Sequence, residues 1–197
     1  MDQQFWDDLY HEKDQLWSGA PNGVLVTEVD GLPPGQALDL GCGEGADALW
    51  LASRGWLVTA VDISHVALER AKAAAGDAKV SWAHADLSTS PLPAGAFDLV
   101  AALYFSVQRE PGHRAVRNML AAVAPGGTLL YAHHDITGHE HEKNPGFDPA
   151  DFYFPADIAE MLDEDQWTIL THETRPRTDV PPEARHVNDI VLKARRR

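Results

Sequence analysis

Cysteine is nearly absent from this chain, because Cys42 is the only one among 197 residues. A single cysteine excludes an internal disulfide framework and is typical of a reducing compartment. Hydrophobic stretches long enough to cross a membrane are also missing, and the acidic N-terminal region, with Asp2, Asp7 and Asp8, does not resemble a signal peptide. We therefore expect a cytoplasmic protein that makes no membrane contact.

Basic residues are scarce as well. Lysine and arginine number 16 against 30 acidic residues, which gives a formal net charge of −14. Proteins hold phosphate backbones through clusters of lysine and arginine, so we expect no nucleic-acid partner. The one basic run, residues 193–197, is interpreted as a solvated terminus. A small-molecule substrate is favoured, and the length suits one domain with a sizeable core.

The most informative stretch, residues 36–45, joins a short apolar run to three alternating glycines. The apolar run suits a buried strand, and glycine lets a turn pass close to a ligand or adopt positive φ. Residues 46–52 then show a helical pattern that Gly55 ends. Strand, glycine turn and helix in this order predict the first unit of a nucleotide-binding α/β domain.

Two cofactors fit this turn. The spacing Gly41-x-Gly43-x-x-Ala46 satisfies the relaxed dinucleotide fingerprint, so a nicotinamide-dependent oxidoreductase is one alternative. The additional Gly45 and the preceding Asp39 favour a different cofactor, and no Tyr-x-x-x-Lys pair occurs in the chain.

Acidic residues also follow the next two expected strands. Asp62 ends the strand at 57–62, where a carboxylate can accept hydrogen bonds from both hydroxyls of a ribose. Ile63 beside it can lie against an adenine face. Asp86 lies near the end of a third strand, expected at 82–87.

The pattern Asp39-x-Gly41-x-Gly43-x-Gly45 resembles motif I of class I S-adenosylmethionine-dependent methyltransferases. The resemblance extends over residues 36–134, because a fourth strand at 97–103 and a helix, turn and fifth strand at 120–130 follow in that family's order. It implies S-adenosyl-L-methionine as cofactor, with its methionine moiety near the first acid and the glycines and its adenine near Asp86. The residues assigned in this way to cofactor binding are Asp39, Gly41, Cys42, Gly43, Gly45, Asp62, Ile63, Asp86, Leu87, Ala102 and Trp17. Cys42 is expected to be mainly a small buried filler of the turn.

The repeating strand–helix units predict an α/β fold, a single doubly wound Rossmann-like domain with a mostly parallel sheet. A helix at 155–162 and two alternating segments at 167–174 and 187–194 follow the core. The resemblance implies that these segments form an antiparallel hairpin closing a seven-stranded sheet of order 3-2-1-4-5-7-6. Within the single domain 1–197 we expect four regions: an N-terminal cap at 1–34, a cofactor-binding core at 36–134, a lid loop at 135–155, and a C-terminal helix and hairpin at 156–197.

The N-terminal region is aromatic and is expected to be helical through Trp17. It resembles the caps of small tellurite-resistance and thiopurine S-methyltransferase-like enzymes, as does the aromatic stretch at 147–158. That resemblance implies a soft or small methyl acceptor, such as a thiol or a chalcogen compound, and places Trp17 and Tyr10 over the cofactor. The same aromatic residues can instead simply pack the cap onto the sheet. Residues 101–106 lack the Asn/Asp-Pro-Pro-Tyr/Phe motif of enzymes that methylate amino groups of bases or glutamine.

Histidines at the end of the fifth strand are candidates for catalysis. His133 and His134 point to opposite faces of a strand, so one of them can face the substrate as a general base. Tyr104, after the fourth strand, is a candidate pocket residue. His139 and His141 are weak candidates for a metal site in the lid, and we expect no metal. A non-catalytic cofactor- or metal-binding regulator stays open as a second alternative, and a monomer and a homodimer are both compatible with the sequence.

Overall fold

The computed structural model describes residues 1–138, 148–178, 180 and 186–197. Its centre is a seven-stranded sheet in the order β3-β2-β1-β4-β5-β7-β6, which confirms the predicted fold. The strands are β1 (Gln36–Leu40), β2 (Leu57–Asp62), β3 (Val80–His84), β4 (Phe97–Leu103), β5 (Val123–His134), β6 (Trp167–Pro176) and β7 (Asn188–Arg196).

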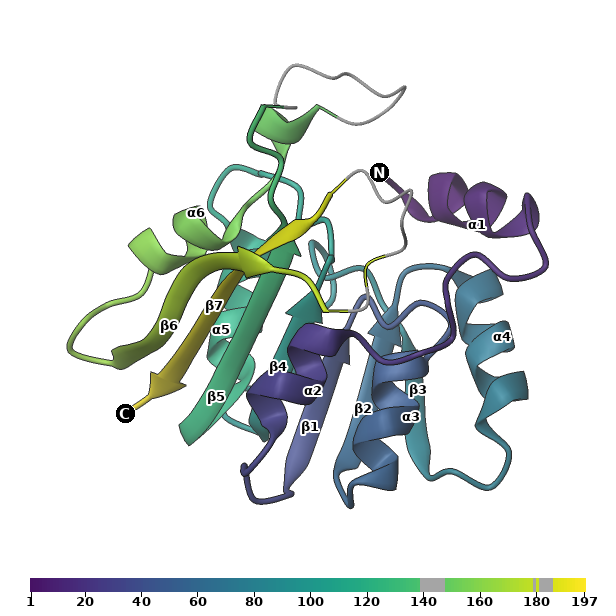
Figure 1. Ribbon diagram of the computed structural model, residues 1–197, viewed down its shortest axis with the longest axis horizontal. Coiled ribbons are helices and arrows are strands. Elements are labelled where there is room, and N and C mark those ends of the chain that lie inside the picture. Colours follow the sequence, from purple (N-terminus) through teal and green to yellow (C-terminus); the bar gives the residue numbers. More distant parts are fainter. Residues whose placement is uncertain (139–147, 179, 181–185) are drawn as a thin grey trace.

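Helices cover both faces of the sheet, and α1 lies at the edge where the parallel strands end (Figure 1). The helices are α1 (Gln3–His11), α2 (Gly23–Val29), α3 (Ala46–Ser53), α4 (His65–Ala75), α5 (Arg114–Ala122), the short 3₁₀ helix η1 (Pro149–Asp151) and α6 (Pro155–Glu160). Among the described residues, no helix has the length and apolar character needed to cross a membrane.

The central strand β1 shows why this sequence forms a sheet covered on both faces. It pairs in parallel with β2 and β4, and every residue after Gln36 is buried. Leu38 and Leu40 pack into the cluster that contains α5 and α6, whereas Ala37 packs into the cluster with α2, α3 and α4. A strand buried on both faces is necessarily apolar throughout, which makes an acid within it exceptional.

The last two strands form the expected antiparallel hairpin. β7 lies between β5 and β6 and runs antiparallel to both. In this register His134 of β5 is the direct partner of Asp189 of β7. The insertion of β7 therefore brings its first residues, including Asp189, to the edge where β4 and β5 end, and leaves the end of the chain at the opposite edge.

Three boundaries differ from the sequence prediction. β3 ends at His84, the partner of Asp62, so Asp86 lies in the loop after the strand. α1 ends at His11 and not at Trp17, because the side chains of Glu44 and Arg70 bind the backbone of the residues that follow. β5 begins at Val123, upstream of the expected turn, and its pairing with β4 shifts register there. Of the expected lid, residues 139–147 with His139 and His141 lie outside the described part of the chain.

Candidate active site

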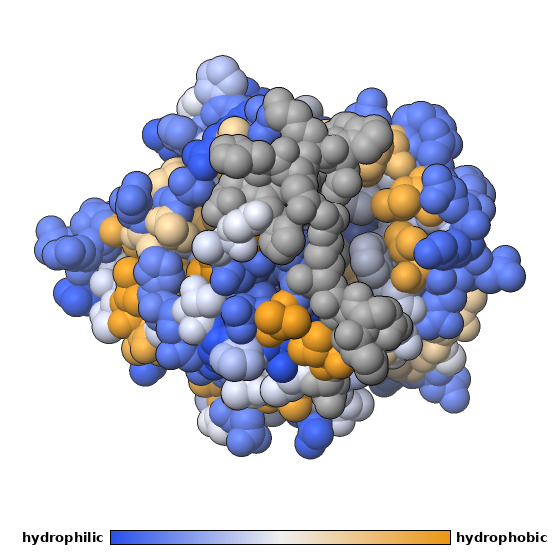
Figure 2. Space-filling model, turned by 45° about the horizontal axis from the view of Figure 1, so that its top comes forward, coloured by the Kyte–Doolittle hydropathy of each residue, from blue (hydrophilic) through white to orange (hydrophobic). Residues whose placement is uncertain are grey.

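The carboxyl ends of β1 and β2 and the chain following β3 and β4 border a cavity of about 630 Å³. Open parallel sheets bind ligands at this edge, and the volume is in the range of small-molecule sites. Its lining includes five residues predicted from the sequence, namely Gly41, Asp62, Ile63, Asp86 and Leu87. Figure 2 turns this edge toward the viewer and shows a mostly hydrophilic surface.

Much of the remaining wall was not singled out from the sequence. It comes from residues 105–110, after β4, and from Phe5 and Trp6 of α1. Residues 105–110 are fixed by contacts with a later part of the chain, since the backbone N–H of Tyr153 donates to the carbonyl of Val107 at 2.9 Å. Arg109 forms a 2.7 Å ion pair with Asp157 of α6. No local motif marks this stretch, because its position depends on contacts with a segment about 45 residues later.

The glycines of the turn are required for two different reasons. Gly41 has φ of +70°, and a Cβ there would lie 2.4 Å from the ring of Phe105, which lines the cavity. Gly45 has φ of +88°, and a Cβ there would lie 2.7 Å from Trp82 and 2.9 Å from Ala71. Gly41 thus keeps the turn close to the cavity, whereas Gly45 lets the turn pack against β3 and α4.

Asp39 lies under this turn and is 3% exposed. Burial, and then the nearby Asp47 and Asp62, raise its pKa well above the usual range. Among the described residues its Oδ2 atom has no hydrogen-bond partner. The backbone N–H of Ala48, in the first turn of α3, works in the opposite direction and lowers the pKa of Asp39. A buried carboxyl with one free oxygen is costly in isolation and suits a site completed by a ligand.

Asp47, also in the first turn of α3, is buried beside Asp39. It accepts the backbone and side-chain N–H groups of Asn22, both at 2.7 Å. Burial still raises the pKa of Asp47. The N-terminus of α3 is consequently surrounded by carboxyl groups, which repel a phosphate that would otherwise bind there.

Asp62, at the end of β2, connects the glycine turn to the start of α4. Its two oxygens accept the N–H groups of Gly43 and Ser64, each at 2.8 Å. Burial raises its pKa, although these N–H groups work in the opposite direction. A carboxylate has about four acceptor positions, so each oxygen keeps capacity for a further donor from the cavity.

The other predicted cofactor residues differ in whether they border the cavity or are buried away from it. Asp86 accepts the N–H and the hydroxyl of Ser88 at 2.8 and 2.7 Å, which orders the loop at the cavity rim. Cys42 and Ala102 are buried, and neither lines the cavity. Burial also raises the pKa of the Cys42 thiol, which agrees with its expected role as a filler of the turn.

The structure separates the two candidate histidines. His133 is buried among aromatic rings, and burial, followed by the neighbouring His134, lowers its pKa to about 4. The side chain of His134 is 31% exposed, and its Nδ1 lies 3.0 Å from Oδ1 of Asp189. An aspartate on Nδ1 favours the tautomer that leaves the Nε2 lone pair available, so His134 has the better arrangement for a base. Neither histidine is among the residues that line the cavity.

Asp189, which sequence reasoning missed, collects the polar groups of this second cluster. Its buried carboxylate also accepts the hydroxyl of Tyr104 at 2.7 Å and lies 3.6 Å from Nε of Arg177. Burial, and then Asp189, raise the pKa of Tyr104 above its usual value. Tyr104 has φ of 53°, a conformation rare outside glycine, and its ring lies 4.2 Å from that of His134. The antiparallel register of β5 and β7 was the only signal that could have identified Asp189.

The predicted cap residues lie over the glycine turn. Tyr10 is buried, and its hydroxyl accepts the indole N–H of half-exposed Trp17 at 3.0 Å. A Cβ on Gly43 would lie 2.9 Å from the Tyr10 hydroxyl. Among the described residues, no group of three or more His, Cys, Asp or Glu side chains is arranged to hold a metal.

A sheet of this order with an antiparallel β7 is the class I methyltransferase fold. Residues 37–127 match the family described as methyltransferase domain. This match, the fold and the relatives below together support a class I S-adenosylmethionine-dependent methyltransferase domain, with S-adenosylmethionine as its cofactor.

Known proteins resemble this chain to different extents. An uncharacterized methyltransferase of Mycobacterium tuberculosis is 41% identical over 92 residues, which are 47% of either chain. Thiocyanate methyltransferase 1 of Arabidopsis thaliana is 30% identical over 143 residues, covering 68% of this chain and 63% of that protein. The structure of an S-adenosylmethionine-dependent methyltransferase from Mesorhizobium loti superimposes with a TM-score of 0.71 at 22% identity, over 87% of this chain and 95% of that one. The match thus spans about half the length of the mycobacterial relative.

Proposed function

We propose that the protein transfers the methyl group of S-adenosylmethionine to a small-molecule acceptor at the carboxyl edge of its sheet. The observation that carries this proposal is the set of buried carboxyl groups around the glycine turn, Asp39, Asp47 and Asp62. A dinucleotide would place its pyrophosphate at the N-terminus of α3, against these acids. A cofactor with hydroxyl and ammonium groups instead supplies the hydrogen-bond donors that acids accept.

The residues present fit such a cofactor. Asp62 would hold the ribose hydroxyls, since it lines the cavity and keeps acceptor capacity. The unpartnered oxygen of Asp39 would face the amino end of the methionine moiety, below Gly41 and Gly43. When bound, S-adenosylmethionine supplies an already activated methyl group, so the protein must mainly orient the acceptor and exclude water.

His134 and Asp189 would serve as the base for an acceptor that carries a proton. The bound cofactor would supply the methyl group and keep the bonding electron pair on its sulfur, which leaves the acceptor proton for the protein's own residues to remove. The acceptor proton passes to Nε2 of His134, and Asp189 stabilises the resulting imidazolium. Tyr104 and Arg177 keep the carboxylate of Asp189 in position.

Small sulfur compounds are the acceptor class that we favour. The similarity to a thiocyanate methyltransferase supports this choice. A thiol with a pKa of about 8.5 is mostly protonated at neutral pH, so it gains reactivity from a base. Thiocyanate is an anion and has no proton to lose, so it provides a matched acceptor that does not need His134.

Calorimetric titration with S-adenosylmethionine, S-adenosylhomocysteine and NADH tests the cofactor. We expect micromolar binding of the two sulfur compounds and none of NADH. Binding of NADH alone would overturn the proposal in favour of an oxidoreductase. Binding of S-adenosylmethionine and S-adenosylhomocysteine without methyl transfer to any thiol, to thiocyanate or to selenium and tellurium oxyanions would contradict the proposed acceptor class.

A further inference from the structure

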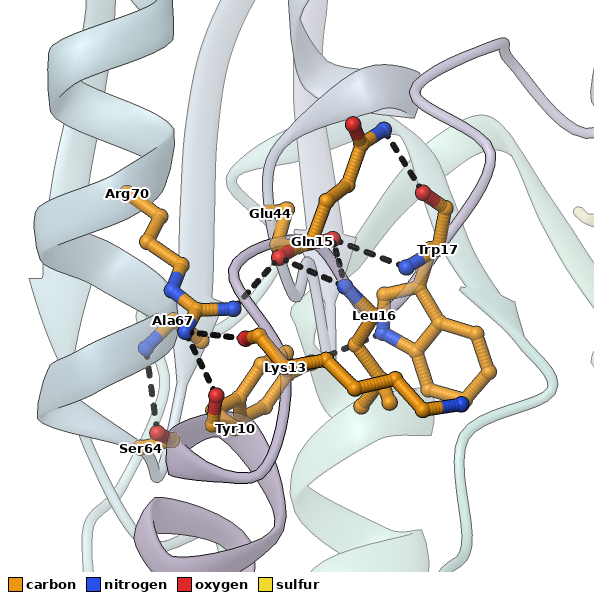
Figure 3. A network of polar contacts seen from close by, with 9 residues as sticks. All are labelled: Tyr10, Lys13, Gln15, Leu16, Trp17, Glu44, Ser64, Ala67 and Arg70. Carbon is orange, nitrogen blue, oxygen red and sulfur yellow. Dashed lines mark hydrogen bonds and ion pairs between the residues drawn. The ribbon is translucent and has the colours of Figure 1, made fainter.

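The chain after α1, residues 12–17, crosses the glycine turn without regular secondary structure. The side chain of Glu44, which lies between Gly43 and Gly45, binds the backbone of this segment (Figure 3). Its carboxylate accepts the N–H of Leu16 at 3.1 and 3.2 Å and the N–H of Trp17 at 2.9 Å. One side chain of the turn thus replaces the helical hydrogen bonds that the segment lacks.

Arg70 of α4 completes the arrangement from the opposite side. Its guanidinium forms a 2.9 Å ion pair with Glu44 and donates to the carbonyl of Lys13 at 2.6 Å and to that of Tyr10. The planar fork of an arginine can bind three acceptors in this way, whereas the single ammonium of a lysine matches them poorly. Glu44 is only 12% exposed, so solvent screens these contacts weakly.

The segment carries the aromatic pair that covers the turn. Trp17 follows directly on the amide that Glu44 holds, and its indole donates to the hydroxyl of Tyr10, whose carbonyl Arg70 binds. Both rings approach Gly43, whose own N–H is bound by Asp62. The position of the aromatic pair is therefore coupled to the turn through Glu44 and Arg70. It is also coupled through Gly43 to Asp62, the residue proposed to hold the ribose.

We propose that Glu44 and Arg70 are positioning residues of a latch that closes residues 10–17 over the methionine side of the cofactor. This inference rests on the proposed function. Neither residue touches the reacting atoms. The latch holds Tyr10 and Trp17 in place, so that the cofactor leaves only after the contacts of Glu44 have been broken. Glu44 occupies an unspecified position of the glycine motif, and it connects the turn to the cap.

The experiment measures the dissociation rate of S-adenosylhomocysteine by stopped-flow tryptophan fluorescence, with excess S-adenosylmethionine as the displacing ligand. We expect Glu44→Ala and Arg70→Met each to accelerate dissociation by about tenfold, because each loses charge-assisted hydrogen bonds. The double variant should be little faster than either single variant, since both changes open one latch. Arg70→Lys should recover part of the effect.

Glu69→Ala is the matched control. Glu69 is an acid of α4 that directly precedes Arg70, but its ion pair with Lys72 is exposed and does not involve the cap. Dissociation rates for Glu44→Ala and Arg70→Met within twofold of the Glu69→Ala rate would overturn the latch. Additive effects of the two changes would also overturn it. If Glu44→Ala does not fold, Glu44→Gln gives the same comparison, since its amide oxygen retains one N–H partner but loses the ion pair.

The outcome for the latch is separable from that for the proposed function. If the unmodified protein binds neither S-adenosylmethionine nor S-adenosylhomocysteine, the proposed function fails and the latch with it. If both bind and Asp62→Ala weakens them, but the latch variants dissociate at the control rate, only the latch fails.

Discussion

The two halves of the carboxyl edge are built differently. Around β1 and β2 the polar groups are acids at the carboxyl ends of these strands, and they bind backbone N–H groups nearby, as Asp62 does with Gly43 and Ser64. Around β4 and β5 the polar groups come from positions far apart, since Tyr104 and Asp189 are separated by 85 residues. The first half is a cradle made by local sequence, and the second is assembled by the pairing of β5 with β7. We expect the first to determine cofactor affinity and the second to determine acceptor reactivity.

The largest expected effect is on the first half. Asp62→Ala should weaken S-adenosylmethionine and S-adenosylhomocysteine about 1,000-fold, because two hydrogen bonds to a charged acceptor are lost. Calorimetry measures the affinity, and a thermal melt establishes that the variant remains folded. Affinity equal to that of the unmodified protein would show that β2 does not end at the ribose.

The second half should respond in rate and not in cofactor affinity. His134→Ala and Asp189→Asn should each lower kcat/KM for an alkyl thiol about 100-fold at pH 7, the usual contribution of a general base. Initial-rate assays with 2-mercaptoethanol and with thiocyanate give the comparison. The loss should shrink above the pKa of the thiol, where the thiolate forms without help, and thiocyanate should show no loss. Equal losses for both acceptors would remove His134 from proton transfer.

A stability effect separates the roles of the glycines. Gly45→Ala should lower the free energy of unfolding by about 2 kcal/mol, since it combines a left-handed φ with a methyl group pressed against Trp82. Gly31→Ala is the control, because Gly31 also has positive φ, at +78°, but nothing within 4 Å of the added Cβ. Urea titration measures both. Similar losses for the two variants would mean that φ alone sets the requirement at 45.

The smallest effect concerns His133. Its pKa is lowered from 6.5 to about 4 in the folded protein, so the unfolded chain takes up a proton at a higher pH than the folded one. The stability that His133 contributes is therefore present above pH 6.5 and is lost as the pH falls toward 4. His133→Phe should reduce this acid sensitivity by on the order of 1 kcal/mol at pH 5. Urea midpoints between pH 4 and pH 7 give the measurement, and an unchanged pH slope would contradict it.

The glycine turn and the strands that Asp39 and Asp62 belong to could be predicted because each depends on residues close together in the sequence. The strand order depends on distant pairings and was implied by the resemblance to a known family. A buried strand is apolar, and the first polar residue after it marks the edge where ligands bind. The cap helix was predicted too long, since nothing local in residues 12–17 indicates that Glu44 and Arg70 bind their backbone.

By itself, the sequence determined the parallel strands and the glycine turn between β1 and α3, because hydrophobic periodicity and glycine spacing act over a few residues. The strand order was implied by the resemblance to a known family. Only the tertiary structure decided between His133 and His134, since their environments depend on which face of β5 is covered and on the partner that β7 brings. Burial removes water from His133, whereas the register of an antiparallel pair places Asp189 beside His134. Long-range strand pairing determines both the burial of His133 and the position of Asp189 beside His134, and no short sequence motif encodes that pairing.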